Sequence, residues 1–320
     1  MFSATIPRWV QSIAQVFLKA GHGTIDLVKD LKNKTSRTVA HLAINCPYQN
    51  RLSALADILI CYGGGQSIVF TSTKKEANDL LLSEKIKKDI EVMHGDIAQN
   101  QREVTLKRFK EGKFSVLVAT DVASRGLDIP CVDLVVQIEP PKDAETYIHR
   151  SGRTARAGRS GTCITFYTLK QKMMISQIEH KAGIIFTKIG IPQPNDVIRA
   201  SFRDTLKQLK EVEDKVIPIF EDAAANLIDV EGGDAKRALC KTLALLSGHH
   251  KEVLQDRSLL NGQQDMVTFQ MILDKPFYSV SMVWNMIKRY APDQVSQQVR
   301  IMRAFKDMTG ACFDVPADHA

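Results

Sequence analysis

The sequence predicts an α/β fold for the first half of the chain, because short apolar runs alternate there with helical stretches. The runs are rich in β-branched residues and apolar at consecutive positions, as in strands covered on both faces. Such alternation predicts a parallel sheet with right-handed crossovers, whose ligands bind beyond the carboxyl ends of the strands. The predicted strands are 38–44, 67–71, 90–94, 116–120, 134–138 and 162–167. The predicted helices are about 50–61, 74–84, 99–110 and 143–151.

The pattern changes after residue 190, where the breaker cluster "GIPQP" predicts a domain boundary. Two helices are then predicted near 212–227 and 234–247, after an amphipathic helix that begins near residue 196. Its apolar residues at helical spacing are Ile198, Phe202, Leu206 and Leu209. These helices carry no catalytic pattern, and we expect them to act in packing or association.

The last part of the chain, from about residue 257, has an α+β pattern. We expect a strand at 266–273, a helix at 279–290 and a hairpin formed by 299–305 and 311–315. Trp284 lies on the apolar face of the predicted helix, so it is interpreted as a core residue, with base stacking as the alternative.

The charge of the chain is concentrated in its first half. The net charge is +7, and residues 1–170 hold 24 Lys and Arg against 17 Asp and Glu, which accounts for all of it. A basic excess in one domain indicates a polyanionic partner, although a merely solvated basic surface is the alternative. The six cysteines form no C-x-x-C pair, which argues against a metal site or a disulfide scaffold. No apolar run approaches the length of a membrane span, and we expect no membrane partner.

Five short motifs occur in a defined order along the first half. They are "SAT" (3–5), "IVF" (68–70), "QNQR" (99–102) just after "HGD", "ATDVASRGLDI" (119–129) and "HRSGRTAR" (149–156). Their order and spacing resemble motif III, motif IV, the Q-x-x-R motif, motif V and motif VI of the second RecA-like lobe of DEAD-box RNA helicases. The resemblance implies a RecA-like parallel-sheet lobe, the helicase C-terminal domain.

Arginines recur at every third position from 150 to 159, and guanidinium groups suit phosphate oxygens because they donate paired hydrogen bonds. Arg153 and Arg156, three residues apart, would project together from a helical turn. The resemblance implies that both reach the γ-phosphate of ATP and are catalytic. It also implies that Asp128 binds the ribose and that Gly126 allows the turn beside it. Family motif VI usually has glycine where this chain has Ala155, a change expected to be tolerated.

Motif III and the RNA-contact positions are also carried over from the family. Ser3 and Thr5 would help couple the two lobes. Six positions match contacts to the RNA backbone, which depend on phosphate and ribose rather than on base sequence. They are Gln99, Arg102, Thr120, Arg125, Thr73 and Gly95. For Arg102, the alternative is an exposed helix arginine paired with a carboxylate.

The 320 residues contain neither G-x-x-x-x-G-K-[ST] nor D-E-x-D. In the family these motifs lie in the first lobe, where they hold the ATP phosphates and Mg²⁺. Met1 lies inside "MFSATIP", where the family places the junction after that lobe. We therefore expect a fragment, or a partial gene model, of a longer helicase that uses ATP and Mg²⁺. The chain alone is expected to be inactive.

The C-terminal part narrows the resemblance. "QDRSLLNG" (255–262) and "GACFDVP" (310–316) resemble the GUCT domain of the nucleolar RNA helicase II/Gu group. The implied parts are the end of the first lobe with the interlobe linker, the second lobe, a helical dimerisation segment and the GUCT domain. Their ranges are 1–37, 38–190, 191–250 and 251–320.

The group resemblance implies a homodimer through residues 196–247 and an RRM-like α+β fold for the GUCT domain. In that domain Phe269 and Phe313 are the candidate base-stacking residues, and a structural or protein-binding role is the alternative. The usual G-F-x-F-V signature of RNA-binding RRMs is absent.

The expected function is therefore that of an ATP-dependent RNA helicase that remodels RNA duplexes, in ribosomal RNA processing. The expected location is the nucleus and nucleolus, by resemblance. The alternatives are a non-catalytic RNA-binding adaptor derived from a helicase and a bare dimerising scaffold.

Overall fold

The computed structural model divides the chain into two compact units. The first comprises Met1–Leu52 and Tyr62–Ile189, and the second comprises Ser53–Cys61 and Gly190–Ala320. The structure describes residues 8–19, 21–23, 25, 35–86, 88–121, 129–155, 158–248 and 256–320. The first described element is the helix α1 (Arg8–Phe17), which the sequence pattern did not predict.

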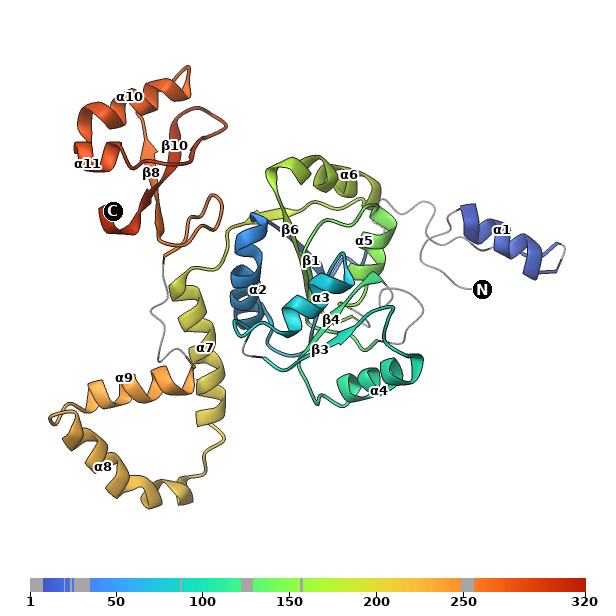
Figure 1. Cartoon of the computed structure of the whole chain (residues 1–320), viewed down its shortest axis with the longest axis horizontal. Helices are drawn as coiled ribbons and strands as arrows, with labels where there is room; N and C mark the ends of the chain where they lie inside the picture. Colours follow the sequence, from blue (N-terminus) through green and yellow to red (C-terminus); the bar gives the residue numbers. More distant parts are fainter. Residues whose placement is uncertain are drawn as a thin grey trace. The chain divides into compact units, whose positions relative to one another are not determined.

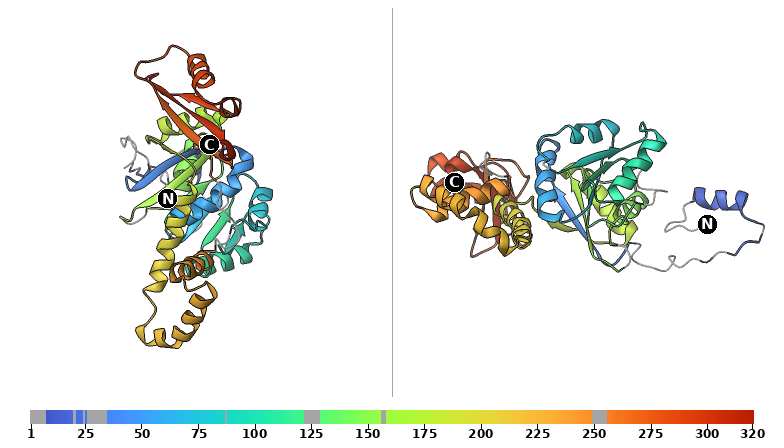
Figure 2. Two further views of the ribbon diagram at one scale, coloured as in Figure 1. Left: turned by 90° about the vertical axis from the view of Figure 1, so that its left-hand side faces the viewer. Right: turned by 90° about the horizontal axis from the view of Figure 1, so that it is seen from below.

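A seven-stranded sheet forms the centre of the first unit, with helices around it (Figure 1, Figure 2). Its order is β3-β4-β2-β5-β6-β1-β7, and the described pairings are parallel. The strands are β1 (Val39–Asn45), β2 (Ser67–Phe70), β3 (Ile90–Met93), β4 (Val116–Ala119), β5 (Leu134–Gln137), β6 (Gly161–Tyr167) and β7 (Thr187–Ile189). The six predicted strands are confirmed, and β7 is an addition.

The helices of this unit follow the strands, as expected for right-handed crossovers. They are α2 (Tyr48–Tyr62), which contributes to both units, α3 (Lys74–Leu81), α4 (Gln99–Lys110), α5 (Ala144–Ser151) and α6 (Lys172–Ala182). Side-chain caps set two of the starting points. Thr73 accepts a hydrogen bond from the Glu76 amide at the start of α3, and Asp143 accepts one from the Thr146 amide at the start of α5. Gly183, with φ +70°, ends α6 in a left-handed conformation.

The strands β2, β4 and β5 are buried at every position, as their consecutive apolar residues predict. The core of the unit includes Phe70, Leu117 and Tyr147, each with no more than a trace of exposed surface. A sheet covered in this way leaves only its edges and the loops beyond its strands for binding.

The second unit begins with a helical segment. It consists of α7 (Pro194–Leu209), the 3-10 helix η3 (Asp214–Phe220), α8 (Glu221–Val230) and α9 (Ala235–Leu246). The structure confirms the predicted helices. The helix predicted near 212–227 is divided between η3 and α8. Many large apolar side chains on these helices are 39–79% exposed, including those at the helical spacing noted in α7, whereas Val197 is buried.

The rest of the second unit is a small α+β domain. Its three-stranded antiparallel sheet has the order β8-β10-β9. The elements are β8 (Met266–Ile272), α10 (Val280–Tyr290), α11 (Asp293–Ser296), β9 (Met302–Ala304) and β10 (Gly310–Pro316). Trp284 is partly buried and packs against the core cluster around Val283 and Val315, which favours its interpretation as a core residue.

The two stretches of the sequence that resemble the GUCT domain are joined by a buried carboxylate. Asp314 is 1% exposed and accepts hydrogen bonds from Ser258 Oγ and Thr268 Oγ1, both at 2.6 Å. Ser258 Oγ in turn accepts from the amides of Leu260 and Asn261 at 3.0 Å, which closes the "RSLLNG" turn. Because a buried carboxylate needs partners of this kind, each stretch depends on the other.

The same turn is attached to the α2 segment within the second unit. The buried Arg257 forms an ion pair with Asp57 and donates to Ser53 Oγ at 2.8 Å. No helix in the described part of the chain has the length and apolarity that a membrane span requires.

Candidate functional site

Three loops that hold predicted RNA-contact residues meet at the carboxyl-terminal edge of the large sheet, where its strands end. They follow the carboxyl ends of β3, β4 and β2, which are neighbours in that order (Figure 1). Gly95 follows β3, Thr120 follows β4 and Thr73 follows β2. The amide of Thr120 donates to the Met93 carbonyl at 3.3 Å, which links two of the strand ends directly. The structure therefore brings these residues to one edge.

The Q-x-x-R motif forms the first turn of α4. Arg102 donates from Nη2 to the Gly95 carbonyl at 2.8 Å and from Nη1 to Gln99 Oε1 at 3.4 Å. Gln99 is also held by Glu103 Oε1 at 3.0 Å. The described ion pairs do not include Arg102, so the alternative of a carboxylate partner finds no support among the described residues. Instead the arginine joins the "HGD" turn to α4.

One donor of Arg102 has no acceptor among the described residues. Its Nε is buried and has no hydrogen-bond partner among them. A buried donor of this kind is costly unless it is paired.

The neighbouring side chains are set by local hydrogen bonds. His94 is buried, and its Nε2 lies 3.2 Å from Asn78 Oδ1, while its Nδ1 accepts from the Asp96 amide at 3.4 Å. Because Nδ1 accepts a hydrogen bond, Nε2 is the nitrogen that donates to Asn78 Oδ1. Lys74 and Asp96 form an exposed ion pair at 2.6 Å between the loops that carry Thr73 and Gly95. The Lys74 ammonium lowers the pKa of Asp96 below its usual value.

The arginines of the motif VI region point in different directions. Arg150 is 3% exposed and turns inward, where Nε and Nη2 donate to Asp121 Oδ1 at 2.8 and 2.7 Å. Its Nη1 donates to Gln137 Oε1 at 3.3 Å, and its guanidinium lies 5.2 Å from the centre of the Phe70 ring. Arg150 thus holds the start of motif V. Arg159 is exposed and lies 3.6 Å from Asp133, so neither arginine is aimed at a ligand.

Arg153 lies in a turn rather than in a helix, because α5 ends at Ser151. Whether Arg153 and Arg156 project together stays a prediction, because Arg156 lies outside the described residues. The Nε of Arg153 donates to the His149 carbonyl at 3.4 Å, and its own carbonyl accepts from the Val132 amide at 3.1 Å. The side chain is half-buried, which leaves part of the guanidinium at the surface.

The turn after Arg153 has an unusual backbone at Ala155. This residue has φ +55°, in the left-handed region that favours glycine. Gly161 lies close to it, and a Cβ there would meet Thr154 Oγ1 at 1.9 Å and the Ala155 amide nitrogen at 2.9 Å. The tight packing keeps the turn in this conformation, so Ala155 is accommodated at a cost.

Several predicted site residues lie outside the described part of the chain. They are Ser3, Thr5, Arg125, Gly126, Asp128 and Arg156. Two residues that sequence reasoning missed are Asp121 and Arg150, whose ion pair connects motifs V and VI. The signal was present in the sequence, since both residues lie inside motifs already recognised.

The aromatic candidates of the small domain lie on one face of its sheet, where Phe313 packs against the core and Phe269 is 37% exposed. Phe269 and Phe313 are cross-strand partners, with ring centres 6.1 Å apart and ring planes at 21°. Phe313 shares its face of β10 with Ala311 and Val315 and packs against the same core cluster. The opposite face of the described strands, with Gln270 among its residues, carries no aromatic side chain. This geometry favours the structural alternative for Phe313, whereas the exposed ring of Phe269 does not distinguish the two alternatives.

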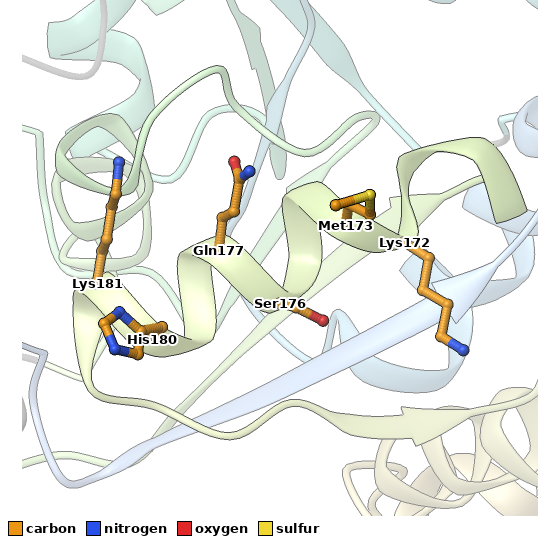
Figure 3. A pocket seen from close by; sticks show the side chains of 6 residues that line it. All are labelled: Lys172, Met173, Ser176, Gln177, His180 and Lys181. Carbon is orange, nitrogen blue, oxygen red and sulfur yellow. The ribbon is translucent and has the colours of Figure 1, made fainter.

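A depression of about 570 Å³ lies along α6. Figure 3 shows the six lining side chains, which all come from that helix: Lys172, Met173, Ser176, Gln177, His180 and Lys181. The depression contains none of the predicted site residues. Among the described residues there is also no group of three or more His, Cys, Asp and Glu side chains that could hold a metal ion.

Family models match three parts of the chain in sequence. Residues 50–158 match the helicase conserved C-terminal domain, residues 193–246 match the DDX21/DDX50 dimerisation domain, and residues 248–320 match the GUCT (NUC152) domain. The three matched ranges follow one another along the chain without overlap.

Curated relatives match along nearly the whole chain. Nucleolar RNA helicase 2 of Rattus norvegicus is 43% identical over 317 residues, which is 98% of this chain and 40% of the relative. ATP-dependent RNA helicase DDX50 of Homo sapiens is 41% identical over 99% of this chain and 43% of the relative. DEAD-box ATP-dependent RNA helicase 7 of Spinacia oleracea is 43% identical over 99% and 46%. The chain spans less than half the length of these relatives.

A solved structure supports the fold of the first unit. S. cerevisiae Dbp5 bound to RNA and ADP BeF3 aligns with a TM-score of 0.52 and 31% identity, over 59% of this chain and 50% of that one. With the motif geometry, the three domain models and the relatives in agreement, the chain belongs to the DEAD-box RNA helicases, in the group of nucleolar RNA helicase 2 and DDX50 that carries a GUCT domain.

Proposed function

We propose that this chain supplies the second RecA-like lobe of an ATP-dependent RNA helicase that separates short RNA duplexes. The observation that carries the proposal is the edge formed by the loops after β2, β3 and β4. There Arg102 is held by the Gly95 carbonyl and Gln99, with its Nε buried and unpartnered among the described residues. Such an edge suits a phosphate backbone, and the basic excess of the first half would favour its approach.

The proposed RNA contacts are independent of base sequence. Gln99, Arg102, Thr120, Arg125, Thr73 and Gly95 would bind phosphate and 2′-hydroxyl groups. The side chain of Thr73 already caps α3, and its hydroxyl can still donate to an oxygen of the backbone. Contacts of this type bind one strand of any sequence and do not distinguish between the bases. The similar S. cerevisiae Dbp5 chain was solved bound to RNA, which supports this assignment.

The nucleotide would bind at the motif V and motif VI loops. The donor set there fits ATP, since guanidinium groups match phosphate oxygens and a carboxylate matches ribose hydroxyls. Arg153 and Arg156 would stabilise the charge on the γ-phosphate, Asp128 would bind the ribose, Gly126 would allow the turn, and Ser3 with Thr5 would couple the lobes. Mg²⁺, which neutralises phosphate charge when bound, would be held by a first lobe with the Walker A and DEAD motifs.

In the intact enzyme the second lobe has two tasks. Its RNA edge binds one strand, and its arginines complete a nucleotide site that opens when the lobes separate. The Asp121–Arg150 ion pair joins the strand end of motif V to the helix of motif VI, so a shift at either is passed to the other. In this proposal the chain alone does not hydrolyse ATP. The name of nucleolar RNA helicase 2 supports a nucleolar location, and the proposed process is ribosomal RNA processing.

RNA binding by the chain tests the proposed edge. Arg102→Ala should weaken binding of a fluorescent single-stranded RNA about tenfold, because one charge-assisted contact to phosphate is lost. The salt dependence should become shallower by about 0.7 in log–log slope, whatever the base sequence. The matched control is Lys107→Ala, which removes an exposed charge from the same helix outside the motif. Equal affinities and slopes for Arg102→Ala and the unchanged chain would contradict the proposal.

A further inference from the structure

A second polar cluster lies at the same edge of the large sheet, beyond the loops of the predicted RNA contacts. The edge continues from β2 through β5 and β6 to β1. Glu139 follows β5, Gln171 follows β6 and Tyr48 follows β1, with Arg51 one turn further along α2. All four residues belong to the first unit. None of them is in a helicase motif named above.

At the centre of this cluster is a buried arginine. Arg51 is 3% exposed, and its donors reach three acceptors: the Cys46 carbonyl at 3.3 Å, Glu139 Oε1 at 3.1 Å and Gln171 Oε1 at 3.2 Å. Each acceptor comes from the segment after a different strand. Arg51 therefore fixes three loop segments in one arrangement.

Tyr48 lies directly on this arginine. The Arg51 guanidinium carbon is 3.9 Å from the centre of the Tyr48 ring, and Gln171 Nε2 donates to Tyr48 Oη at 3.2 Å. The tyrosine is nevertheless 57% exposed. One face of the ring is occupied by the guanidinium, so the exposed surface is that of the other face and the edge. An aromatic ring held rigidly with one face open is the arrangement on which a base stacks in single-strand binding proteins.

The cluster is connected to the loop of a predicted RNA contact. Ser72 Oγ donates to Glu139 Oε2 at 3.5 Å, and Ser72 immediately precedes Thr73. Three strand spacings separate β2 from β1 in the sheet, which is about 14 Å. A strand of RNA on the edge near Thr73 would need to extend only this far to bring a base over Tyr48.

We propose that Tyr48 is a stacking site for a nucleobase, which extends the RNA-binding edge from β2 to β1. The ligand is an unpaired base of any type, because every base has a face that can stack. The proposal rests on RNA binding at the edge described above. It differs from the motif contacts in that it uses a base rather than the phosphate backbone.

The test measures the affinity of the full chain for a fluorescent single-stranded RNA at several salt concentrations. Tyr48→Ala should weaken binding about 5- to 150-fold, the range for loss of one stacked base. The salt slope should not change, since no phosphate contact is lost. Tyr48→Phe and Tyr48→Trp should bind as tightly as the unchanged chain, because both retain a ring. Tyr278→Ala, which removes a 94% exposed tyrosine elsewhere, is the matched control.

Replacement of single bases in the RNA locates the contact. An abasic nucleotide at the position over Tyr48 should weaken binding by the unchanged chain and by Tyr48→Phe, and have no effect on Tyr48→Ala. If Tyr48→Ala destabilises the fold, photocrosslinking of 5-iodouridine RNA to Tyr48 in the unchanged chain gives the same information. Absence of that crosslink, or an abasic effect that persists in Tyr48→Ala, would overturn the proposal.

The outcomes separate this site from the proposed function. Normal affinity of Tyr48→Ala with weakened Arg102→Ala would remove the stacking site and leave the RNA edge in place. Weakened RNA binding by Tyr48→Ala, with normal RNA binding by Arg102→Ala, would support the stacking site and contradict the phosphate edge. No RNA binding by the unchanged chain would overturn both.

Discussion

At the scale of single residues, the motif VI turn shows how one substitution changes the local energy. Ala155 occupies a left-handed position where the family motif usually has glycine. For a residue with a Cβ this conformation costs about 1–2 kcal/mol relative to the right-handed one. Glycine avoids the cost, although its greater freedom in the unfolded chain offsets part of the gain.

Ala155→Gly is therefore expected to increase the free energy of unfolding by about 0.5–1 kcal/mol. Urea denaturation of both proteins would measure the change. The control is Gly158→Ala, at φ +81° with open space around its Cβ, which should be destabilising by a similar amount. A destabilised Ala155→Gly protein would show that the side chain contributes packing that outweighs the backbone strain.

At the scale of elements, strand β1 and helix α5 are joined through a buried histidine. His41 is 9% exposed, and its Nδ1 lies 2.6 Å from Tyr147 Oη, while its Nε2 lies 3.1 Å from Thr35 Oγ1. Burial lowers the pKa of His41 to about 4. The folded chain therefore keeps this ring neutral at pH values where the unfolded chain, with a pKa near 6.5, binds a proton.

The sign of the pH effect follows from this difference. Between pH 6.5 and 4 the unfolded state holds more protons at this site, so stability falls as the pH is lowered through that window. From pH 7.5 to 5 the loss due to His41 should be about 2 kcal/mol. Urea denaturation at both pH values would measure it. His41→Gln should show a loss smaller by that amount, and equal losses in both proteins would contradict the burial of a neutral ring.

Most elements could be predicted because their sequence patterns are local. The six predicted strands have mostly apolar runs rich in β-branched residues, whereas β7 has three residues, two of them exposed, and gives no such signal. Helix α6 was missed although its buried residues, Ile175, Ile178 and Ala182, recur at helical spacing. The Arg150–Asp121 pair and the contacts of Arg51 with Glu139 and Gln171 join residues far apart in the chain, and spacing along the sequence does not predict such contacts. The motifs predicted the residues of the proposed RNA edge, and the helix predicted at about 143–151 ends where α5 ends.

At the scale of the whole molecule, the helical segment exposes apolar side chains, which are stabilised when another protein surface removes them from water. Phe202 and Leu206 lie one turn apart on α7 and are 41% and 39% exposed. Larger apolar patches of this kind mark interaction sites. Together with the match to a dimerisation domain, they support the proposed homodimer through residues 196–247.

The double variant Phe202→Glu and Leu206→Glu should convert a dimer into a monomer, because charges in an apolar interface would lose hydration without a partner. Sedimentation equilibrium over a range of concentrations would measure the mass. Gln208→Glu, an exposed polar change on the same helix, should leave the dimer intact. Deletion of residues 196–247 should also give a monomer. If both altered proteins sediment with the mass of a dimer, this segment is excluded as the interface.

The central claim is that this lobe completes an RNA-dependent ATPase. The most direct measurement is ATP hydrolysis by the chain with RNA, alone and with an added first lobe that carries the Walker A and DEAD motifs. The proposal predicts activity only in the combined sample, and a loss of about 10³-fold or more in Arg153→Ala with RNA binding retained. Hydrolysis by the chain alone, near-normal turnover of Arg153→Ala, or RNA binding without hydrolysis in the combined sample would contradict it. The last of these results would indicate a non-catalytic RNA-binding adaptor.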